Sequence, residues 1–313
     1  MRVVKTFLTI TLAASALVGC GSREEASQPA PLRVAEQHGL AYLPLGIMQV
    51  EGYLDGVEWV RTGNATVIRE AMLAGRLDIG FMGIPPYLIG RDRGTGWEAF
   101  TGLSEAPLGL VTLREGYRSL ADLTPTDRIA LPQPGSIQHI LLAMAADRTF
   151  GDPRYFDDRL VSMGHPEGYN ALLARRELAA HFTAPPYLFS ALQEEGATLL
   201  LHGNEAFGDR FTFIIGVGAP GWGEDDRSRE QRERFLAALD RAIEAARTIQ
   251  QPSSAEEASE ADRLLTALAQ FYSLDRQTLE EQLRHPGTVY SRDIRGLEEF
   301  EVQMTRFGYL EER

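Results

Sequence analysis

The alternation of strand-forming and helix-forming segments is the feature that most restricts what this chain can fold into. Four apolar segments have the length of strands, at residues 32–36, 57–61, 78–82 and 98–103. Segments with helical spacing lie between them, and the one after residue 64 has apolar side chains at Val67, Ile68, Ala71 and Met72. Strands that alternate with helices in this way predict βαβ units and a largely parallel sheet.

The same rhythm restarts after residue 107 and predicts a second module of the same class. Apolar strands expected at residues 108–113 and 211–218 enclose this module, so we expect an inserted domain whose chain leaves and returns through a two-stranded hinge. From residue 226 the chain is charged and helical, with a break before a new helix that Ser253 or Ser254 caps. The expected divisions are lobe 1 from residues 32–107, lobe 2 from 108–210, and 211–313 as the return strand and helices that complete lobe 1.

The N-terminus has the pattern of an export signal. Arg2 and Lys5 precede an apolar stretch that is too short to span a membrane, and "LVGC" ends at Cys20. The tetrapeptide resembles a bacterial lipobox, so residues 1–19 are interpreted as a lipoprotein signal peptide and Cys20 as the lipidation site. Residues 20–31 are small, polar and proline-bearing, which predicts a flexible tether. Because Cys20 is the only cysteine, the sequence predicts no internal disulfide.

The charge of the chain restricts its partners. The formal net charge is −13, and Lys5 is the only lysine. This net negative charge argues against nucleic acid and against an anionic lipid surface as partners. We expect a monomer that binds a small molecule.

Candidate binding residues follow from where strands end. In open α/β sheets ligands bind beyond the carboxyl ends of the strands, and "GIPPY" and "TAPPY" are two such ends followed at once by a proline-initiated helix. Free N–H groups at helix starts near Asn64 and Ser136 attract acceptor groups. The alternative is that these two side chains only cap their helices.

Histidines also gather near the predicted strand ends, at His38, His139, His165 and His181. A metal site built from three of them with Glu105 is an alternative, but the spacing matches no local metal motif. We expect His38 and His165 to contact a ligand, whereas His181 is also compatible with the core. No arginine stands at the strand ends considered, which argues against a strong carboxylate or sulfonate clamp. The candidate ligand-binding residues are Gln37, His38, Tyr42, Thr62, Asn64, Met82, Gly83, Glu105, Ser136, His165, Thr183 and Tyr187.

Several segments, in order, resemble a known family. "LRVAEQHGLAYLPLGIMQVEGYLDGVEWVRTGNATVIREAMLAGRLDIGFMG", "SLADLTPTDRIALPQPGSIQHILL" and "YNALLARRELAAHFTAPPYLFSALQEEGATLLL" are similar to substrate-binding proteins of bacterial ABC importers, of the nitrate/sulfonate/taurine and thiamine-precursor type. The resemblance spans nearly the whole mature chain. One departure is "RRELAA", where the family pattern has Gly and Asp at the positions of Arg176 and Ala179.

The resemblance implies an α/β fold with two lobes, of the periplasmic-binding-protein type. Each lobe is expected to be a mixed, mostly parallel sheet flanked by helices, with the helical C-terminal segment packed on the first lobe. The implied function is an extracytoplasmic, lipid-anchored solute-binding component that closes on a small organic anion or heteroaromatic compound and delivers it to a permease and its ATPase, without a cofactor. An anchored ligand sensor is an alternative. A pyrimidine-synthase-like enzyme shares the fold, but the cysteine-rich motif of those enzymes is absent, so no enzymatic activity is expected.

Overall fold

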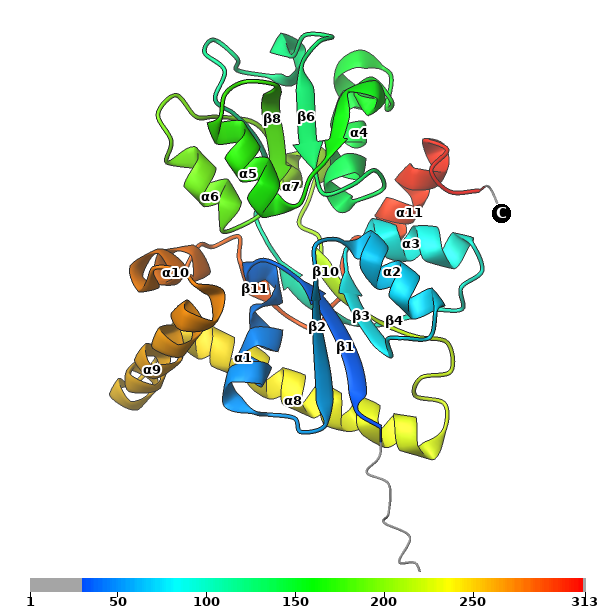
Figure 1. Cartoon of the computed structure of the whole chain (residues 1–313), viewed down its shortest axis with the longest axis vertical. Coiled ribbons are helices and arrows are strands. Elements are labelled where there is room, and N and C mark those ends of the chain that lie inside the picture. Colours follow the sequence, from blue (N-terminus) through cyan, green and yellow to red (C-terminus); the bar gives the residue numbers. More distant parts are fainter. Residues whose placement is uncertain (1–29, 312–313) are drawn as a thin grey trace, which may run out of the picture. The chain divides into compact units, whose positions relative to one another are not determined.

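The structure is a computed structural model that describes residues 30–311 of the chain. The predicted signal peptide, most of the tether and Cys20 lie outside the described residues. Among the residues described, no helix combines the length and the hydropathy that crossing a membrane requires. The names lobe 1 and lobe 2 are kept below for the residues that build the first and the second sheet with their helices (Figure 1).

Lobe 1 is built on a six-stranded mixed sheet. The strand order is β11-β4-β10-β3-β1-β2. The strands are β1 (Leu32–Gln37), β2 (Val57–Thr62), β3 (Ile79–Met82), β4 (Glu98–Glu105), β10 (Ile214–Gly218) and β11 (Val289–Tyr290). β1 runs parallel to β2 and β3, whereas β10 runs antiparallel to β3 and β4. The carboxyl ends of β1, β2 and β3 therefore meet at one edge of the sheet.

Helices cover both faces of this sheet. They are α1 (Leu43–Glu51), which follows the short η1 (Leu40–Tyr42), α2 (Ala65–Leu73), α3 (Ile84–Asp92), α8 (Asp226–Gln250), α9 (Ala255–Tyr272), α10 (Arg276–Leu283) and α11 (Leu297–Arg306). α8 packs on α1 and α9, and α11 packs on α3. Figure 1 shows α1, α8 and α9 together on one side and α2 and α3 on the other. The prediction that the C-terminal helices pack on the first lobe is confirmed.

Lobe 2 is built on a five-stranded mixed sheet with the order β7-β6-β8-β5-β9. Its strands are β5 (Gly109–Thr112), β6 (Arg128–Leu131), β7 (Leu160–Ser162), β8 (Leu178–Thr183) and β9 (Thr198–His202). Its helices are α4 (Ile137–Phe150), α5 (His165–Leu173), α6 (Tyr187–Leu192) and α7 (Gly203–Phe207), with the short η2 (Leu120–Asp122) and η3 (Asp157–Arg159). β6 is parallel to β7 and β8, and β5 is antiparallel to β8 and β9. The predicted α/β class with two mixed, helix-flanked sheets is confirmed. The expectation that the sheets are mostly parallel is wrong, because five of the nine strand pairings among the described residues are antiparallel, the strands β5, β10 and β11 each pairing in that sense.

Two expectations about strands need correction. β5 lies inside the second sheet, between β8 and β9, and β10 lies inside the first, between β3 and β4. These strands therefore do not form a two-stranded hinge, and the chain passes between the sheets in the segments that precede them. The strand β11 was not expected, because a strand of two residues has no periodicity to detect.

Local sequence explains several boundaries. The side chain of Asn64 accepts hydrogen bonds from the N–H groups of Thr66 and Val67 and so begins α2. Ser136 begins α4 and Ser254 begins α9 in the same way. The "RRELAA" departure is a turn in which Arg175 has a φ of 52°, and β8 then begins at Leu178.

The two lobes contact each other at more than one place. The Leu40 N–H donates to the Pro185 carbonyl at 3.4 Å. Gly39 has a φ of 131°, and a Cβ there would stand 3.3 Å from the same carbonyl oxygen. This position therefore favours glycine for both its conformation and the close approach. Far along the chain, Arg306, the last residue of α11, pairs with Asp147 of α4 at 2.5 Å.

Candidate functional site

A cavity of about 110 Å³ lies where the ends of strands from both lobes meet, and residues of both lobes form its wall. A single water needs only about 10–15 Å³ of such space, so the cavity has room for a small organic molecule. The wall is made by the first residues of five helices and the loops before them. From lobe 1 these are η1 with α1, α2 and α3, and from lobe 2 they are α4 and α5.

The structure brings half of the twelve candidate residues into this wall. Those that line the cavity are Gln37, His38, Tyr42, Gly83, Ser136 and His165. They come from both lobes and from strand ends that are far apart in the sequence. The expectation that strand ends of both modules face one cavity therefore agrees with their placement.

The other six candidates lie elsewhere, and most have structural partners. Thr62 and Asn64 shape the start of α2, where the Thr62 hydroxyl donates to the carbonyl groups of Glu36 and Asn64. Met82 is fully buried. Glu105 forms ion pairs with Arg210 at 2.7 Å and Arg295 at 3.7 Å, so its carboxylate serves lobe 1 instead of the cavity.

Thr183 and Tyr187 lie directly behind the wall. The Thr183 hydroxyl is hydrogen-bonded to Nδ1 of His165 at 2.8 Å, so it holds the orientation of a wall residue. The Tyr187 ring stands parallel to the His165 ring, with 6.2 Å between the centroids. Both side chains therefore support His165 without lining the cavity themselves.

His165 is uncharged at neutral pH. Burial, and secondarily the nearby His38, lower its pKa to about 4. His181, 6.0 Å behind it between ring centroids, is fully buried and has neither ring nitrogen paired. Burial also brings the pKa of His181 well below its ordinary value. The alternative that His181 belongs to the core is the one that the structure supports.

His38 stands at the mouth of the cavity, between groups of opposite charge. Burial and the charge of Arg61 lower the pKa of His38, and Glu167 opposes this effect. Glu167 is the one carboxylate among the described residues of the cavity wall. The wall therefore holds two histidines whose pKa values are both lowered.

A second hollow shares His38 and Gly39 with the cavity and opens on its other side. We call it the outer groove; its wall is His38, Gly39, Leu40, Arg61, Pro186, Tyr187, Phe271, Tyr272, Ser273 and Leu274. Arg61 pairs with the buried carboxylate of Glu36 at 2.6 Å and lies 4.8 Å above the Phe271 ring. The strand-end segments considered from the sequence contain no arginine, but Arg61, one residue before the end of β2, lines the outer groove together with His38.

Several wall residues were not singled out from the sequence. They are three polar residues, Gln133, Gln138 and Glu167, and apolar ones such as Pro86, Pro132, Pro166, Pro185 and Phe213. Most belong to the segments that follow predicted strands, so position at a strand end was the available signal. Gln133 also crosses between the lobes, since its Oε1 accepts from the N–H of Thr66 at 3.2 Å and from the Thr66 hydroxyl at 2.8 Å. No pattern within the chain predicts a contact across 67 residues.

Within residues 30–311, no group of three or more His, Cys, Asp or Glu side chains is placed to hold a metal ion. His139, one of the histidines considered for such a site, is instead engaged locally. Its Nδ1 accepts from the Gly135 N–H at 2.9 Å, and its Nε2 is 2.9 Å from an oxygen of Asp157. It therefore holds the turn that leads into Ser136.

Comparisons with known proteins place the fold. No family model matches the chain, and no curated protein matches it by sequence. Among solved structures, the periplasmic aliphatic sulphonate-binding protein SsuA of Escherichia coli is 19% identical, with a TM-score of 0.67 over 91% of this chain and 89% of that one. The alkanesulfonate-binding protein SsuA of Xanthomonas axonopodis pv. citri, bound to MOPS, is 21% identical, with a TM-score of 0.68 over 91% and 94%.

A third similar structure comes from the fungus Candida albicans, and its description names the generic periplasmic binding protein fold. It is 12% identical to this chain, with a TM-score of 0.68 over 91% of this chain and 92% of that one. Identities this low carry the fold and leave the ligand open. With its two mixed sheets and the cavity between their strand ends, the chain has the periplasmic binding protein fold.

Proposed function

We propose that this protein is the extracytoplasmic solute-binding component of an ABC importer. The observation that carries the proposal is the cavity, whose wall takes residues from both lobes at the carboxyl ends of their strands. A solute bound there touches both lobes at once, so its binding favours the closed arrangement of the lobes over an open one. A permease that recognises the closed arrangement then receives only loaded protein.

The solute in this proposal is a small organic molecule, of the anionic or the heteroaromatic class. The wall combines flat apolar surfaces, such as Pro86 and Pro132, with side-chain amides, such as Gln37 and Gln138. Such a mixture is typical of ligand pockets, in which apolar walls supply area and a few polar groups fix orientation. The likeness to sulfonate-binding proteins supports an imported solute as the general class.

Solute capture tests the proposal directly. The purified protein is incubated with a small-molecule extract of its host, separated by gel filtration and denatured, and the released compounds are identified by mass spectrometry. The control is Gly83→Leu, because a Cβ at Gly83 already stands 3.5 Å from the Ile137 Cβ of the other lobe and a larger side chain fills the cavity. Wild type releases one dominant compound and the variant, checked for folding by circular dichroism, releases none. Release of nothing from the wild type contradicts the proposal.

The same proposal places the protein on the outer face of the cell membrane through lipid on Cys20. The support is the "LVGC" sequence after a short apolar stretch. Cys20→Ser is expected to move the protein from the membrane fraction to the soluble fraction of lysed cells. Unchanged fractionation of the variant contradicts the anchor and leaves the solute-binding proposal standing.

An anchored sensor for a membrane receptor is the second candidate, since the same cavity serves it. Uptake of the captured compound, labelled with an isotope, separates the two in cells that lack the gene. Loss of uptake supports the importer, whereas normal uptake with a lost response to the compound supports the sensor.

A further inference from the structure

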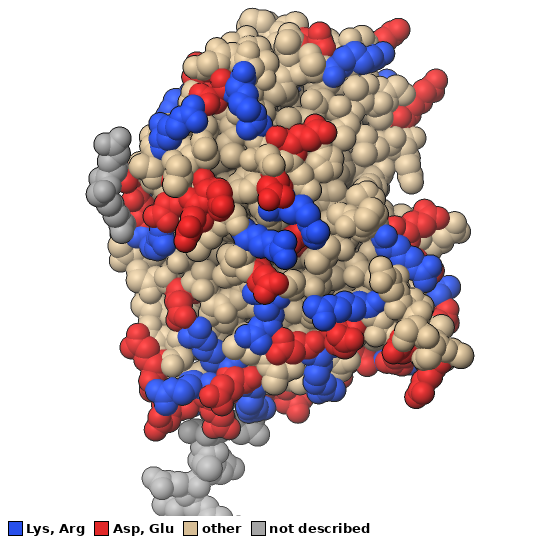
Figure 2. Space-filling view, turned by 180° about the vertical axis from the view of Figure 1, so that it is seen from behind, with Lys and Arg blue, Asp and Glu red and all other residues tan. Residues whose placement is uncertain are grey.

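The charges around the cavity point to the class of its solute. Among the described residues of the wall, none is lysine or arginine, and the one carboxylate is Glu167. Elsewhere the protein has many charged side chains, and Figure 2 shows acidic and basic groups interspersed over lobe 1. The absence of cations from the wall is therefore a property of this site and not of the composition.

The two histidines of the wall do not supply a positive charge. Burial holds the pKa of His165 to about 4, and the pKa of His38 is lowered too. The tautomer of His165 depends on which way its hydrogen bond with Thr183 runs. In either tautomer the neutral ring keeps one nitrogen, Nε2, as a single uncharged donor or acceptor.

The cation beside His38 is already paired with a carboxylate. Arg61 lies in the outer groove and directs its guanidinium to the Glu36 carboxylate, with contacts from Nη2 at 2.6 Å and from Nε at 3.0 Å. Glu36 is 1% exposed, so this charge pair is held in place inside lobe 1. Glu36 also contributes, after burial, to the raised pKa of the wall residue Tyr42, so its negative charge is felt on the cavity side.

Helix starts are the remaining source of positive potential, and here proline residues or capping side chains remove some of their donors. A helix offers its first N–H groups to an anion, but proline has none to offer. Proline occupies an early position in α1, α3 and α5, as Pro44, as Pro85 with Pro86, and as Pro166. Three of the five helix starts around the cavity therefore each have at least one donor fewer than a helix start without proline.

Two donors at the start of α2 are occupied as well. Asn64 accepts from the N–H groups of Thr66 and Val67, and Gln133 from the other lobe also accepts from the Thr66 N–H. α4 remains, where Ser136 accepts only from the N–H of His139. The first-turn N–H groups of Ile137 and Gln138 have no acceptor within their own helix. The start of α4 and the start of α5, which has no side-chain cap, thus keep a few N–H groups that can bind an acceptor group of the solute.

From these observations we infer that the solute is an uncharged molecule with hydrogen-bonding groups and a flat apolar part, and not a sulfonate, carboxylate or other anion. The inference rests on the proposed function of the same cavity. Removing an anion from water has a large energetic cost, which a site recovers through cations or several aligned donors. This wall instead offers amide side chains, neutral histidine and proline faces, which suit an uncharged solute.

Matched pairs of compounds test the inference. Nicotinamide with nicotinate, benzamide with benzoate, and methanesulfonamide with methanesulfonate differ within each pair mainly in charge at pH 7. Binding of each is measured by calorimetry at constant ionic strength, together with the compound released from the protein in the capture experiment. The uncharged member of any pair that binds is expected to bind at least tenfold more tightly, and the captured compound is expected to be uncharged at pH 7.

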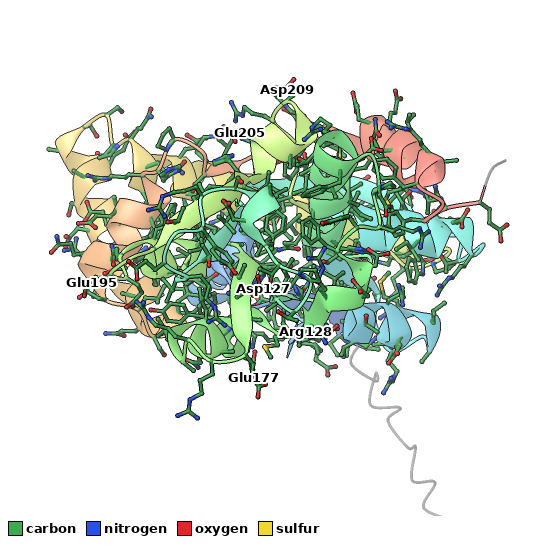
Figure 3. The ribbon with its side chains drawn as sticks, turned by 90° about the horizontal axis from the view of Figure 1, so that it is seen from above. Asp127, Arg128, Glu177, Glu195, Glu205 and Asp209 are labelled. Atoms are coloured by element: carbon green, nitrogen blue, oxygen red, sulfur yellow. The ribbon has the colours of Figure 1, made fainter. Side chains whose placement is uncertain are left out.

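A variant of Glu167 tests whether the preference for uncharged compounds originates in the cavity. Glu167→Gln removes the negative charge at the wall and is expected to reduce the preference for the uncharged member several-fold. Glu177→Gln makes the same chemical change just before β8, at the end of that strand opposite Thr183, where Figure 3 shows the side chain directed outward. This control is expected to leave the preference unchanged.

The possible results distinguish a failure of the inference from a failure of the proposed function. An anionic captured compound, or an anion that binds as tightly as its uncharged counterpart, overturns the inference and leaves the solute-binding function intact. If the protein captures no compound and binds no member of any pair, the proposed function fails, and the inference fails with it.

Discussion

The cavity and the outer groove share His38 and Gly39, yet they differ in charge. The groove contains Arg61, which is paired with Glu36, whereas none of the described residues of the cavity wall is lysine or arginine. The groove and the cavity are built from neighbouring positions of β1 and β2. Glu36 and Arg61 are partners in the parallel register of these strands, and the next residues, Gln37 and Thr62, are partners too. A shift of one residue along a strand thus separates a groove that contains an arginine from a cavity whose described wall contains no lysine or arginine. If the solute is uncharged, as we infer, the cation beside this site does not make it an anion site, because the buried carboxylate of Glu36 already holds that cation.

The largest effect is expected from breaking the ion pair of the groove. Arg61→Met leaves the Glu36 carboxylate, 1% exposed, without its cation, and loss of one partner of a buried pair costs about 3 kcal/mol of the free energy of unfolding. Burial already raises the pKa of Glu36, so lower pH protonates it and relieves the cost. Urea unfolding at pH 7 and pH 5 is expected to show a smaller deficit at pH 5.

The double variant Glu36→Gln with Arg61→Met is the control for this prediction. It removes both charges, so it is expected to recover part of the stability at pH 7. Affinity of the cavity for its captured compound is expected to change by less than threefold in the folded variants, because Arg61 does not line the cavity. Equal stability of Arg61→Met and wild type at both pH values contradicts this account of the groove.

The uncharged histidines in the cavity wall and behind it, His165 and His181, predict a dependence of stability on pH. His165 has a pKa of about 4 when folded and an ordinary value near 6.5 when unfolded, so between these values the unfolded chain binds the additional proton. Stability is therefore highest above pH 6.5 and falls as the pH drops toward 4, by about 3 kcal/mol from this residue. His181 shifts in the same direction.

Substitution of the buried histidine separates this effect from general acid unfolding. His181→Leu removes a group that titrates only on unfolding, so urea unfolding from pH 7 to pH 4.5 is expected to show a shallower loss of stability. His285→Gln, in the segment before β11, is the matched control and is expected to follow the wild type more closely. A variant His181→Leu with an unchanged slope indicates that histidine burial does not set the pH dependence.

A cation placed at the cavity is expected to offset much of its preference for uncharged compounds. Glu167→Arg changes the charge of the wall by two units, and we expect tighter binding of nicotinate by about tenfold, or about 1.4 kcal/mol. Glu177→Arg, at the opposite end of β8, is expected to leave nicotinate binding unchanged. Calorimetry at low and high salt checks the electrostatic origin, since screening weakens the gain. Equal gains in the two variants indicate a general effect of net charge.

The smallest effect is expected from a contact between the lobes that lies outside both the cavity and the outer groove. The Tyr309 hydroxyl is 3.4 Å from both Nε2 of His139 and an oxygen of Asp157, which is long for a hydrogen bond. Tyr309→Phe is therefore expected to lower the free energy of unfolding by less than about 1 kcal/mol and to leave affinity for the captured compound within threefold. A large loss of affinity indicates that this contact controls the cavity through the turn that His139 holds.

The fold was predictable from the sequence because its signals are local. Alternating segments, a capping residue such as Asn64 and the resemblance to importer proteins all appear within short stretches of chain. The site was predictable only in part. Position after a strand identified His38 and His165, but the pairing of Arg61 with Glu36 depends on strand register. The Gln133–Thr66 contact depends on how the two lobes meet. Neither the Arg61–Glu36 pair nor this contact can be predicted from a short segment of sequence.

Hydrogen exchange with and without the captured compound tests most directly the central claim that one solute is held by both lobes. The account predicts slower exchange at the starts of α3 and α4 together, since Gly83 and Ser136 line the same cavity from opposite lobes. The outer surface near Glu177 is expected to exchange at the same rate in both states. Protection confined to one lobe, or protection absent from both helix starts, contradicts a solute bound between them.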